Sequence, residues 1–238
     1  MWYESLSNAN DRILPLMQGV MVGIVTNNND PDNLGRVKVK MPYIDPETES
    51  DWVRVAAMTA GKDRGALFIP EVDDEVLLAF HLGDLAEPFV IGCLWNKKDT
   101  PPAGKDDKNN VRKLRSRSGH EVVFNDKAGD ESVTVVTKKG LKLEMTDKND
   151  TVKLQDSSGS NILTIKGGAS GEIELKSGTT KITINAKGDA TVESTKAVTI
   201  KSTQIAVKAT AQLELAAPVV EVKADGVLTL KGGMIKMN

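Results

Sequence analysis

Apolar and polar residues alternate in short runs along most of the chain, and turn residues follow each run. In the second half the runs repeat one unit: apolar, polar, apolar, then a turn. Such alternation predicts β-strands with one face inward and one face in water. The step between units is 8 to 11 residues at first and 7 or 8 after Val198. The thirteen apolar pairs are Val133/Val135, Leu141/Leu143, Val152/Leu154, Leu163/Ile165, Ile173/Leu175, Ile182/Ile184, Ala190/Val192, Val198/Ile200, Ile205/Val207, Leu213/Leu215, Val220/Val222, Leu228/Leu230 and Ile235/Met237.

Units this short cannot enclose a core within one chain. A single-chain solenoid needs coils of roughly 18 residues or more. A meander would leave about 26 apolar side chains uncovered, and their burial is worth on the order of 50 kcal/mol as an upper estimate. Because no helix is predicted that could cover them, three identical chains are expected to form a rigid prism with an apolar axis. A monomeric β-sandwich or an aggregation-prone repeat is the alternative.

The first half has a different composition. Eight of the nine aromatic residues precede residue 115, and eight of the nine prolines come at or before Pro102. Five or six short strands in about 80 residues indicate a small closed barrel. The strands are predicted at residues 20–25, 35–41, 52–57, 66–69, 75–80 and 89–94. The predicted parts are an N-terminal segment at 1–18, either a docking arm or a frayed end, a barrel at 19–98, a linker or neck at 99–115, and a shaft at 116–238.

Charge and composition exclude several classes of protein. The 31 Lys and Arg against 33 Asp and Glu give a net charge of −2, which excludes a nucleic-acid binder that relies on overall basic charge. A single cysteine excludes a disulfide framework and a multi-cysteine zinc site. No apolar run approaches the roughly 18 residues of a membrane-spanning helix, and Glu4 and Asp11 stand where a secretory signal would be basic. We therefore expect assembly in the cytoplasm without a signal peptide.

A series of motifs lies in order between Ser50 and Asn96. The motif residues are Trp52, Arg54, Gly65, Pro70, Glu71, Asp74, Glu75, Phe80, Gly83, Asp84, Pro88 and Gly92. In this order they resemble the OB-fold domain of contractile-tail spike proteins, the phage baseplate assembly protein V and VgrG families. Residues 33–43 are similar to the hairpin before that domain, and residues 115–126 to the start of the family's β-helix. Asp73 departs from the pattern, since the family usually has Gly there, and a turn of positive φ would strain Asp.

The resemblance implies an all-β protein, with an N-terminal OB-fold barrel followed by a C-terminal intertwined triple-stranded β-helix in a homotrimer. Such a spike stands at the centre of a baseplate and is driven through the target cell envelope when the sheath contracts. The resemblance also implies a separate baseplate hub protein that binds the OB domain and the segment 1–18. The protein would then belong to a virion tail baseplate or an extracellular injection particle.

The C-terminal residues are expected to hold a partner. Some relatives end in a pointed apex, where a His-x-His pair from each chain binds iron, and this sequence has no such pair. The resemblance instead implies a blunt platform for a separate PAAR-like tip protein. The platform residues are Gly232, Gly233, Met234, Ile235, Lys236, Met237 and Asn238. Because the connector is too short for the lysozyme domain of some relatives, we expect no enzymatic activity, catalytic residue, metal or cofactor.

Few residues offer chemistry of their own. Cys93 in the last barrel strand is interpreted as a small buried residue without an activating base. Asp73 and Asp74 are interpreted as a solvated turn rather than a catalytic carboxylate pair. His81 is expected at the surface. His120, in three copies near the axis, leaves a three-histidine metal site open as an alternative.

The neck contains a basic run. Its residues are Arg112, Lys113, Arg115 and Arg117. Pairing with acids such as Glu121 and Asp126 is the favoured interpretation, with no nucleic-acid partner. The alternative is a single-strand nucleic-acid-binding protein with a repetitive β tail, because OB folds bind strands through aromatic platforms in basic grooves.

Overall fold

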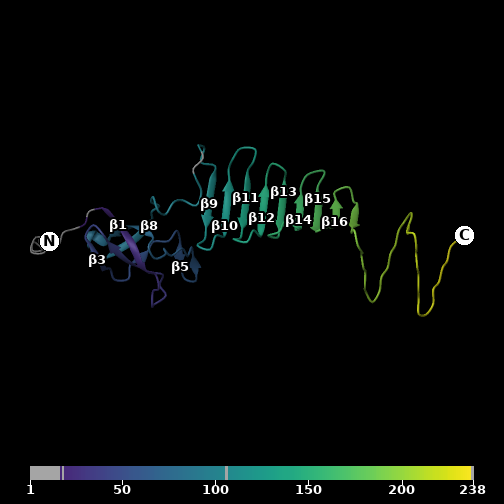
Figure 1. Cartoon of the computed structure of the whole chain (residues 1–238), viewed down its shortest axis with the longest axis horizontal. Helices are drawn as coiled ribbons and strands as arrows, with labels where there is room; N and C mark the ends of the chain where they lie inside the picture. The colour runs from purple at the N-terminus through teal and green to yellow at the C-terminus, as the bar shows by residue number, and fades with distance from the viewer. Residues whose placement is uncertain (1–16, 18, 105–106, 237–238) are drawn as a thin grey trace, which may run out of the picture.

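The computed structural model of the chain describes residues 17, 19–104 and 107–236. Its two parts follow one another along a single long axis (Figure 1). In these residues the only helical element is a 3₁₀ turn, η1 (His81–Gly83), and every other regular element is a strand. No helix in the described ranges is long and apolar enough to span a membrane. The all-β prediction is therefore confirmed.

The first part is a barrel. Its strands are β1 (Val20–Asn27), β2 (Lys38–Met41), β3 (Asp45–Glu49), β4 (Arg54–Val55), β7 (Glu75–Phe80) and β8 (Pro88–Cys93), with a small hairpin of β5 (Ala60–Gly61) and β6 (Arg64–Gly65). The sheet order is β3-β2-β1-β7-β8-β4. An antiparallel bridge between Val37 and Val53 joins the segments that lead into β2 and β4. It is held by two backbone hydrogen bonds of 3.0 and 2.7 Å. This bridge closes the sheet into the predicted barrel.

Valines fill most of the barrel interior. The core consists of Val25, Val37, Val39, Val53, Val76, Leu78 and Val90, none more than 3% exposed. β-branched side chains pack well on a pleated surface, and their small size suits a narrow barrel. Leu78 has the largest volume of the fully buried side chains. Gly23 leaves room for it, because a Cβ at Gly23 would lie only 2.8 Å from Leu78 Cδ1.

The strand predicted at residues 66–69 is absent. Ile69 packs against the core, whereas Leu67 and Phe68 are exposed. The prediction is wrong because both flanking residues act against a strand. Gly65 has a φ of +148°, a conformation that a side chain would clash with, and Pro70 has no N–H to donate. Conversely, β3 was not predicted, because its sequence DPETE has no apolar alternation.

The second part is a nine-stranded antiparallel sheet. Its strands are β9 (Val111–Arg115), β10 (Glu121–Asn125), β11 (Ser132–Val136), β12 (Lys142–Thr146), β13 (Thr151–Gln155), β14 (Asn161–Lys166), β15 (Glu172–Ser177), β16 (Thr180–Asn185) and β17 (Ala190–Glu193). They pair in sequence order and lie across the long axis (Figure 1). The sheet starts at Val111, ahead of the predicted shaft boundary at 116, because β9 pairs with β10 over its full length.

The register aligns apolar side chains into two columns, which together we call the apolar face. The first column is Leu114, Val122, Val135, Leu143, Leu154, Leu163, Leu175, Ile182 and Val192. The second is Phe124, Val133, Met145, Val152, Ile165, Ile173, Ile184 and Ala190. Alternation places the residues between the columns, such as Lys153, on the opposite face. In β12 the apolar pair is Leu143/Met145, so the predicted pair Leu141/Leu143 is wrong: Leu141 precedes the strand.

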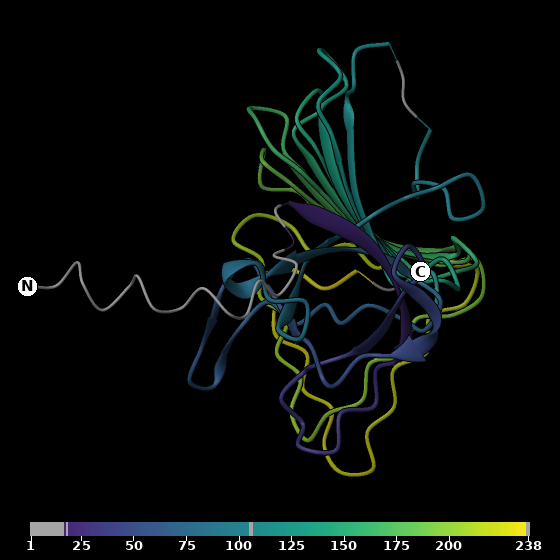
Figure 2. The same ribbon diagram turned by 90° about the vertical axis from the view of Figure 1, so that its left-hand side faces the viewer.

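Residues 194–236 form no strand. They continue along the long axis as a wide zigzag (Figure 1). Seen along that axis, β9–β17 lie stacked on one side while the later segment swings across to the other (Figure 2). Meander turns use glycines of positive φ such as Gly119, Gly140 and Gly188. Residues 194–224 contain no Gly, Asn or Asp, so the chain lacks the residues that tight hairpins require.

Candidate interaction surfaces

The chain leaves its own apolar face uncovered. Along β11–β17, ten of its large members are between 38% and 57% exposed, and Val133, Leu143 and Leu163 are half-buried. Leu154 and Leu175, near the middle of the sheet, are 51% and 50% exposed. A continuous apolar surface along a whole sheet exceeds what monomeric proteins usually leave in water. The face is therefore an interaction surface.

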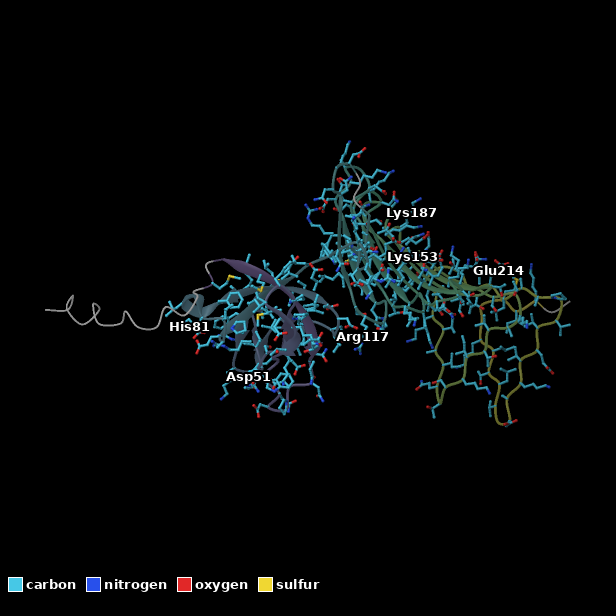
Figure 3. All side chains as sticks on the ribbon, turned by 60° about the vertical axis from the view of Figure 1, so that its left-hand side comes forward. Asp51, His81, Arg117, Lys153, Lys187 and Glu214 are labelled. Atoms are coloured by element: carbon cyan, nitrogen blue, oxygen red, sulfur yellow. The ribbon has the colours of Figure 1, made fainter. Side chains whose placement is uncertain are left out.

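The opposite face of the sheet suits water. Lys and Glu side chains pair there, across strands and along them: Lys142–Glu144 at 2.6 Å, Lys181–Glu174 at 2.8 Å and Lys166–Glu172 at 3.1 Å. The hydrogen bond from Lys181 is the main reason that the pKa of the Glu174 carboxyl is lowered. Charged side chains such as Lys153 and Lys187 project along the shaft (Figure 3). The two faces thus differ as an interior and an exterior do.

Acidic residues pair with every member of the basic run. The ion pairs are Arg112–Asp126, Lys113–Glu121 at 3.0 Å, Arg115–Glu121 at 2.9 Å and Arg117–Glu71 at 3.0 Å. Arg117 lies at the junction of barrel and shaft (Figure 3), and its pair with Glu71 ties the β9–β10 turn to a barrel loop. A phosphate backbone would have to displace these carboxylates, which argues against nucleic-acid binding at the neck.

Several motif residues build the turn that leads into β7. The Asp74 carboxylate accepts the backbone N–H of Glu71 at 2.8 Å. The Pro70 carbonyl accepts the side-chain amide of Asn28 at 3.1 Å, and the Glu75 carboxylate accepts that of Asn96 at 2.9 Å. These residues join loops that are distant in the sequence. Their role in this structure is to shape the barrel.

The other motif residues also serve the barrel architecture. The Arg54 guanidinium lies 4.5 Å from the Phe89 ring centroid, and Lys38 Nζ lies 5.5 Å from that of Trp52. Phe80 packs against the core. Most of the remaining motif positions lie at turns and strand ends: Gly65 ends β6, Gly83 ends η1 with a φ of +85°, and Pro88 begins β8. The Asp84 carboxylate accepts the N–H of Ala86 at 2.9 Å. Gly92 lies within β8 and pairs with Leu77.

Asp73 has the positive φ that its place in the motif predicts. Its φ is +74°, and its backbone N–H donates to the Val25 carbonyl at 2.9 Å. We expect Asp73→Gly to stabilise the barrel by about 0.5 kcal/mol, because glycine adopts this conformation without strain. Asp73→Ala should destabilise it, since alanine is less tolerant of positive φ than aspartate. Urea unfolding followed by tryptophan fluorescence measures both, and a lower midpoint for the glycine variant would contradict the strain.

A buried ion pair organises the β1–β2 loop, and no sequence pattern predicted it. Asp30 is 7% exposed, and its carboxylate contacts Arg36 through Nη2 at 2.6 Å and Nε at 3.0 Å. The same carboxylate accepts backbone N–H groups from Asp32 at 3.1 Å, Leu34 at 2.9 Å and Arg36 at 3.2 Å. The Arg36 hydrogen bond is the main reason that the pKa of Asp30 lies well below its usual range.

This depressed pKa predicts acid sensitivity of the barrel. The contribution of ionised Asp30 is complete above the unfolded-state pKa of about 4 and is lost as the pH falls toward the folded-state value. We expect the melting temperature of wild-type protein to fall between about pH 4 and pH 2, and Asp30→Asn to show a smaller fall from a lower starting value. Asp32→Asn, whose side chain is 66% exposed, is the matched control and should follow wild type. Parallel slopes for wild type and Asp30→Asn would refute the assignment.

The structure corrects one candidate and places the others. Cys93 is exposed, not buried: Ile91 is an extra residue in β8 between the pairs Leu78–Val90 and Leu77–Gly92, and this bulge interrupts the alternation before Cys93. Desolvation, followed by the charge of Asp74, raises the pKa of its thiol, which disfavours a nucleophile. His81 Nδ1 lies 2.6 Å from a Glu87 carboxylate oxygen on the barrel surface. His120 Nδ1 accepts the N–H of Lys138 at 3.3 Å.

Within the residues that the structure describes, no group of three His, Cys, Asp or Glu side chains is placed to hold a metal ion. Of the predicted tip platform, residues 232–236 are described, and Met234 and Ile235 are 76% and 53% exposed. Met237 and Asn238 lie outside the described residues, as does the segment 1–18 apart from Met17, whose N–H donates to Gly83 O at 2.9 Å.

A closed barrel followed by a long meander sheet with an uncovered apolar face is typical of an elongated protein with a barrel head and a shaft. Comparison with known proteins agrees. Residues 21–95 match the type VI secretion system/phage-baseplate injector OB domain. These residues are therefore an injector OB domain, and the chain is similar to VgrG spike proteins.

Three relatives illustrate the similarity. The chain is 32% identical over 138 residues to the type VI secretion system spike protein VgrG3 of Vibrio cholerae serotype O1. The matched segment covers 52% of this chain and 14% of that protein. It is 28% identical over 148 residues to VgrG1b of Pseudomonas aeruginosa, covering 56% and 20%. It is 30% identical over 132 residues to the actin cross-linking toxin VgrG1 of Vibrio cholerae serotype O1, covering 50% and 12%. The matched segments thus span a fifth or less of these relatives.

Proposed function

We propose that this protein is the structural central spike of a contractile injection machine, a phage tail baseplate or an extracellular injection particle. The observation that carries the proposal is the uncovered apolar face, which runs through all nine strands of the second sheet. Three copies that turn this face inward would form a prism with an apolar axis and the Lys/Glu face in water. Ladders of backbone hydrogen bonds run along such a prism, and they make it stiff against axial load.

In the proposed trimer, residues 194–236 would form strands that pair with the other two chains. This segment has apolar pairs but no strand partners among the described residues. In each pair whose two members are described, the first is less exposed than the second, as with Ile205 at 54% and Val207 at 66%. Strands from the two other copies would supply the missing ladder, with the three chains winding around one another. This arrangement is the intertwined triple-stranded β-helix that the family resemblance implies.

The remaining roles follow from the position of each part. The OB barrels form a collar that binds a hub protein, with help from the segment 1–18. The platform at residues 232–238 holds a PAAR-like tip protein, and sheath contraction drives the assembly through the target envelope. The role is mechanical, without catalysis or cofactor. The actin cross-linking in the name of one relative is attributed to that protein, of which this chain matches 12%.

The mass of the purified protein in solution tests the proposal. Light scattering after size exclusion should give about three times the 25.6 kDa of the chain, and this mass should persist in moderate denaturant. A stable monomer would overturn the proposal of a trimeric spike. A fluorescent single-strand titration then distinguishes the rival function, since an OB-fold nucleic-acid binder predicts salt-sensitive binding and the spike predicts none.

A further inference from the structure

A groove of about 980 Å³ lies where the barrel meets the shaft. On the barrel side it is lined by Phe68 and Trp95, and on the shaft side by Leu114, Val122 and Val135. Phe68 follows the β5–β6 hairpin and Trp95 follows β8, so two separate segments bring aromatic rings to one place. The junction is visible in Figure 3 beside Arg117, which also borders the groove.

The barrel core does not account for these two rings. Phe68 is 68% exposed and Trp95 is 69% exposed, while the core is complete without them. Aromatic side chains carry large apolar surfaces, and they are enriched at the energetic centres of protein interfaces. Arg115, Arg117 and Glu121 at the rim already form ion pairs within the chain. The groove therefore suits an apolar occupant rather than a phosphate or an acidic segment.

The first apolar column of the shaft indicates that this occupant is the shaft of a neighbouring chain. Leu114, Val122 and Val135 are the first three members of the first apolar column, which continues through Leu143 to Val192. Adjacent strands are only about 4.7 Å apart. A neighbouring shaft that covers this column at Leu143 therefore also covers its first members, and it reaches the groove. At that point it meets Phe68 and Trp95.

We propose that Phe68 and Trp95 pack against the shaft of a second copy of the chain, so that each barrel clamps its neighbour's shaft. The inference rests on the proposed trimer and adds the contact that fixes the barrels to it. Without such a contact, each barrel is joined to the shaft by the connector and the Arg117–Glu71 pair, which is exposed. With it, the three barrels hold one orientation about the axis.

Fluorescence quenching of Trp95 tests the contact directly. In a background with Trp2→Phe and Trp52→Phe, the acrylamide quenching constant of Trp95 should be at least about threefold lower in the trimer than in Leu154→Lys, which we expect to be monomeric. Equal quenching in both forms would show that the groove is open in the trimer and would overturn the proposal. Shielding of Trp95 only within complete injection particles would also overturn it, because the occupant would then be another protein.

Trimer dissociation provides the second readout. We expect Trp95→Ala and Phe68→Ala each to raise the rate of trimer dissociation in urea by about tenfold or more, since losses at interface anchors mainly change the off-rate. Leu82→Ala is the control, because Leu82 is 85% exposed on the barrel at η1, outside the groove. Trp52 fluorescence in Trp95→Ala verifies that the barrel is folded. A wild-type monomer would instead refute the proposed function, so the two failures are distinguishable.

Discussion

Replacing Leu154 with Lys should reduce the mass of the protein in solution from that of three chains to that of one. Leu154 lies in the middle of the first apolar column, between Leu143 and Leu163 in register. In a trimer, three ammonium groups would be buried around one apolar axis, at a cost of several kcal/mol for each charge. In a single chain the side chain is 51% exposed, so the same change should cost little.

The control is Thr164→Lys. Thr164 pairs with Lys153 on the opposite face, so the variant adds the same charge at the same level of the shaft. It should keep the mass of wild type. Light scattering after size exclusion measures both variants. A trimeric Leu154→Lys would show that the apolar face is not the interface, and the prism would have to be abandoned.

Truncating Leu78 should have the largest effect on the barrel. Leu78 is fully buried and is the largest of the fully buried side chains. Leu78→Ala should lower the free energy of unfolding by about 2 to 5 kcal/mol through lost burial and the cavity that remains. For a domain of this size the melting temperature should fall by more than about 10 °C. Thermal unfolding followed by tryptophan fluorescence measures the change.

Val20→Ala is the matched control on the adjacent strand. Val20 is 55% exposed at the start of β1. Its truncation should change the free energy of unfolding by no more than about 0.5 kcal/mol. If the two variants melted alike, Leu78 would not be at the centre of the core.

Alternation in the sequence was sufficient to predict much of this fold. The runs at 75–80 and in the repeat from Val133 to Val192 became strands, because a period of two leaves little choice of inward face. The failures were local. Polar β3 is held by pairing with β2, which no hydrophobic pattern reveals. The run at 66–69 is apolar because Ile69 packs on the core, and apolar content alone does not distinguish such a loop from a strand.

Of the candidate interaction surfaces, too, only part could be predicted from the sequence. The apolar face was predicted from the pattern, since from Val133 to Val192 its columns are the pairs of the repeat, with Met145 in place of Leu141. The groove at Phe68 and Trp95 was not, because it joins residues from three parts of the chain whose proximity only the fold creates. The loop built on Asp30 and Arg36 was missed for a related reason. A carboxylate in a turn-rich sequence such as NNNDPDN is usually solvated, and only the packing of the loop shows this one to be buried.

The absence of Gly, Asn and Asp from residues 194–224 has a consequence for the order of assembly. Strands β9–β17 pair with their neighbours in sequence, so their ladder can form quickly and in a single chain. The later segment cannot turn back on itself, and its ladder must wait until other chains arrive. Assembly should therefore start at the neck and propagate toward the tip, with a rate that depends on protein concentration only until the first turn of the three chains has formed. Beyond that point, each further turn is an intramolecular step of one growing rod.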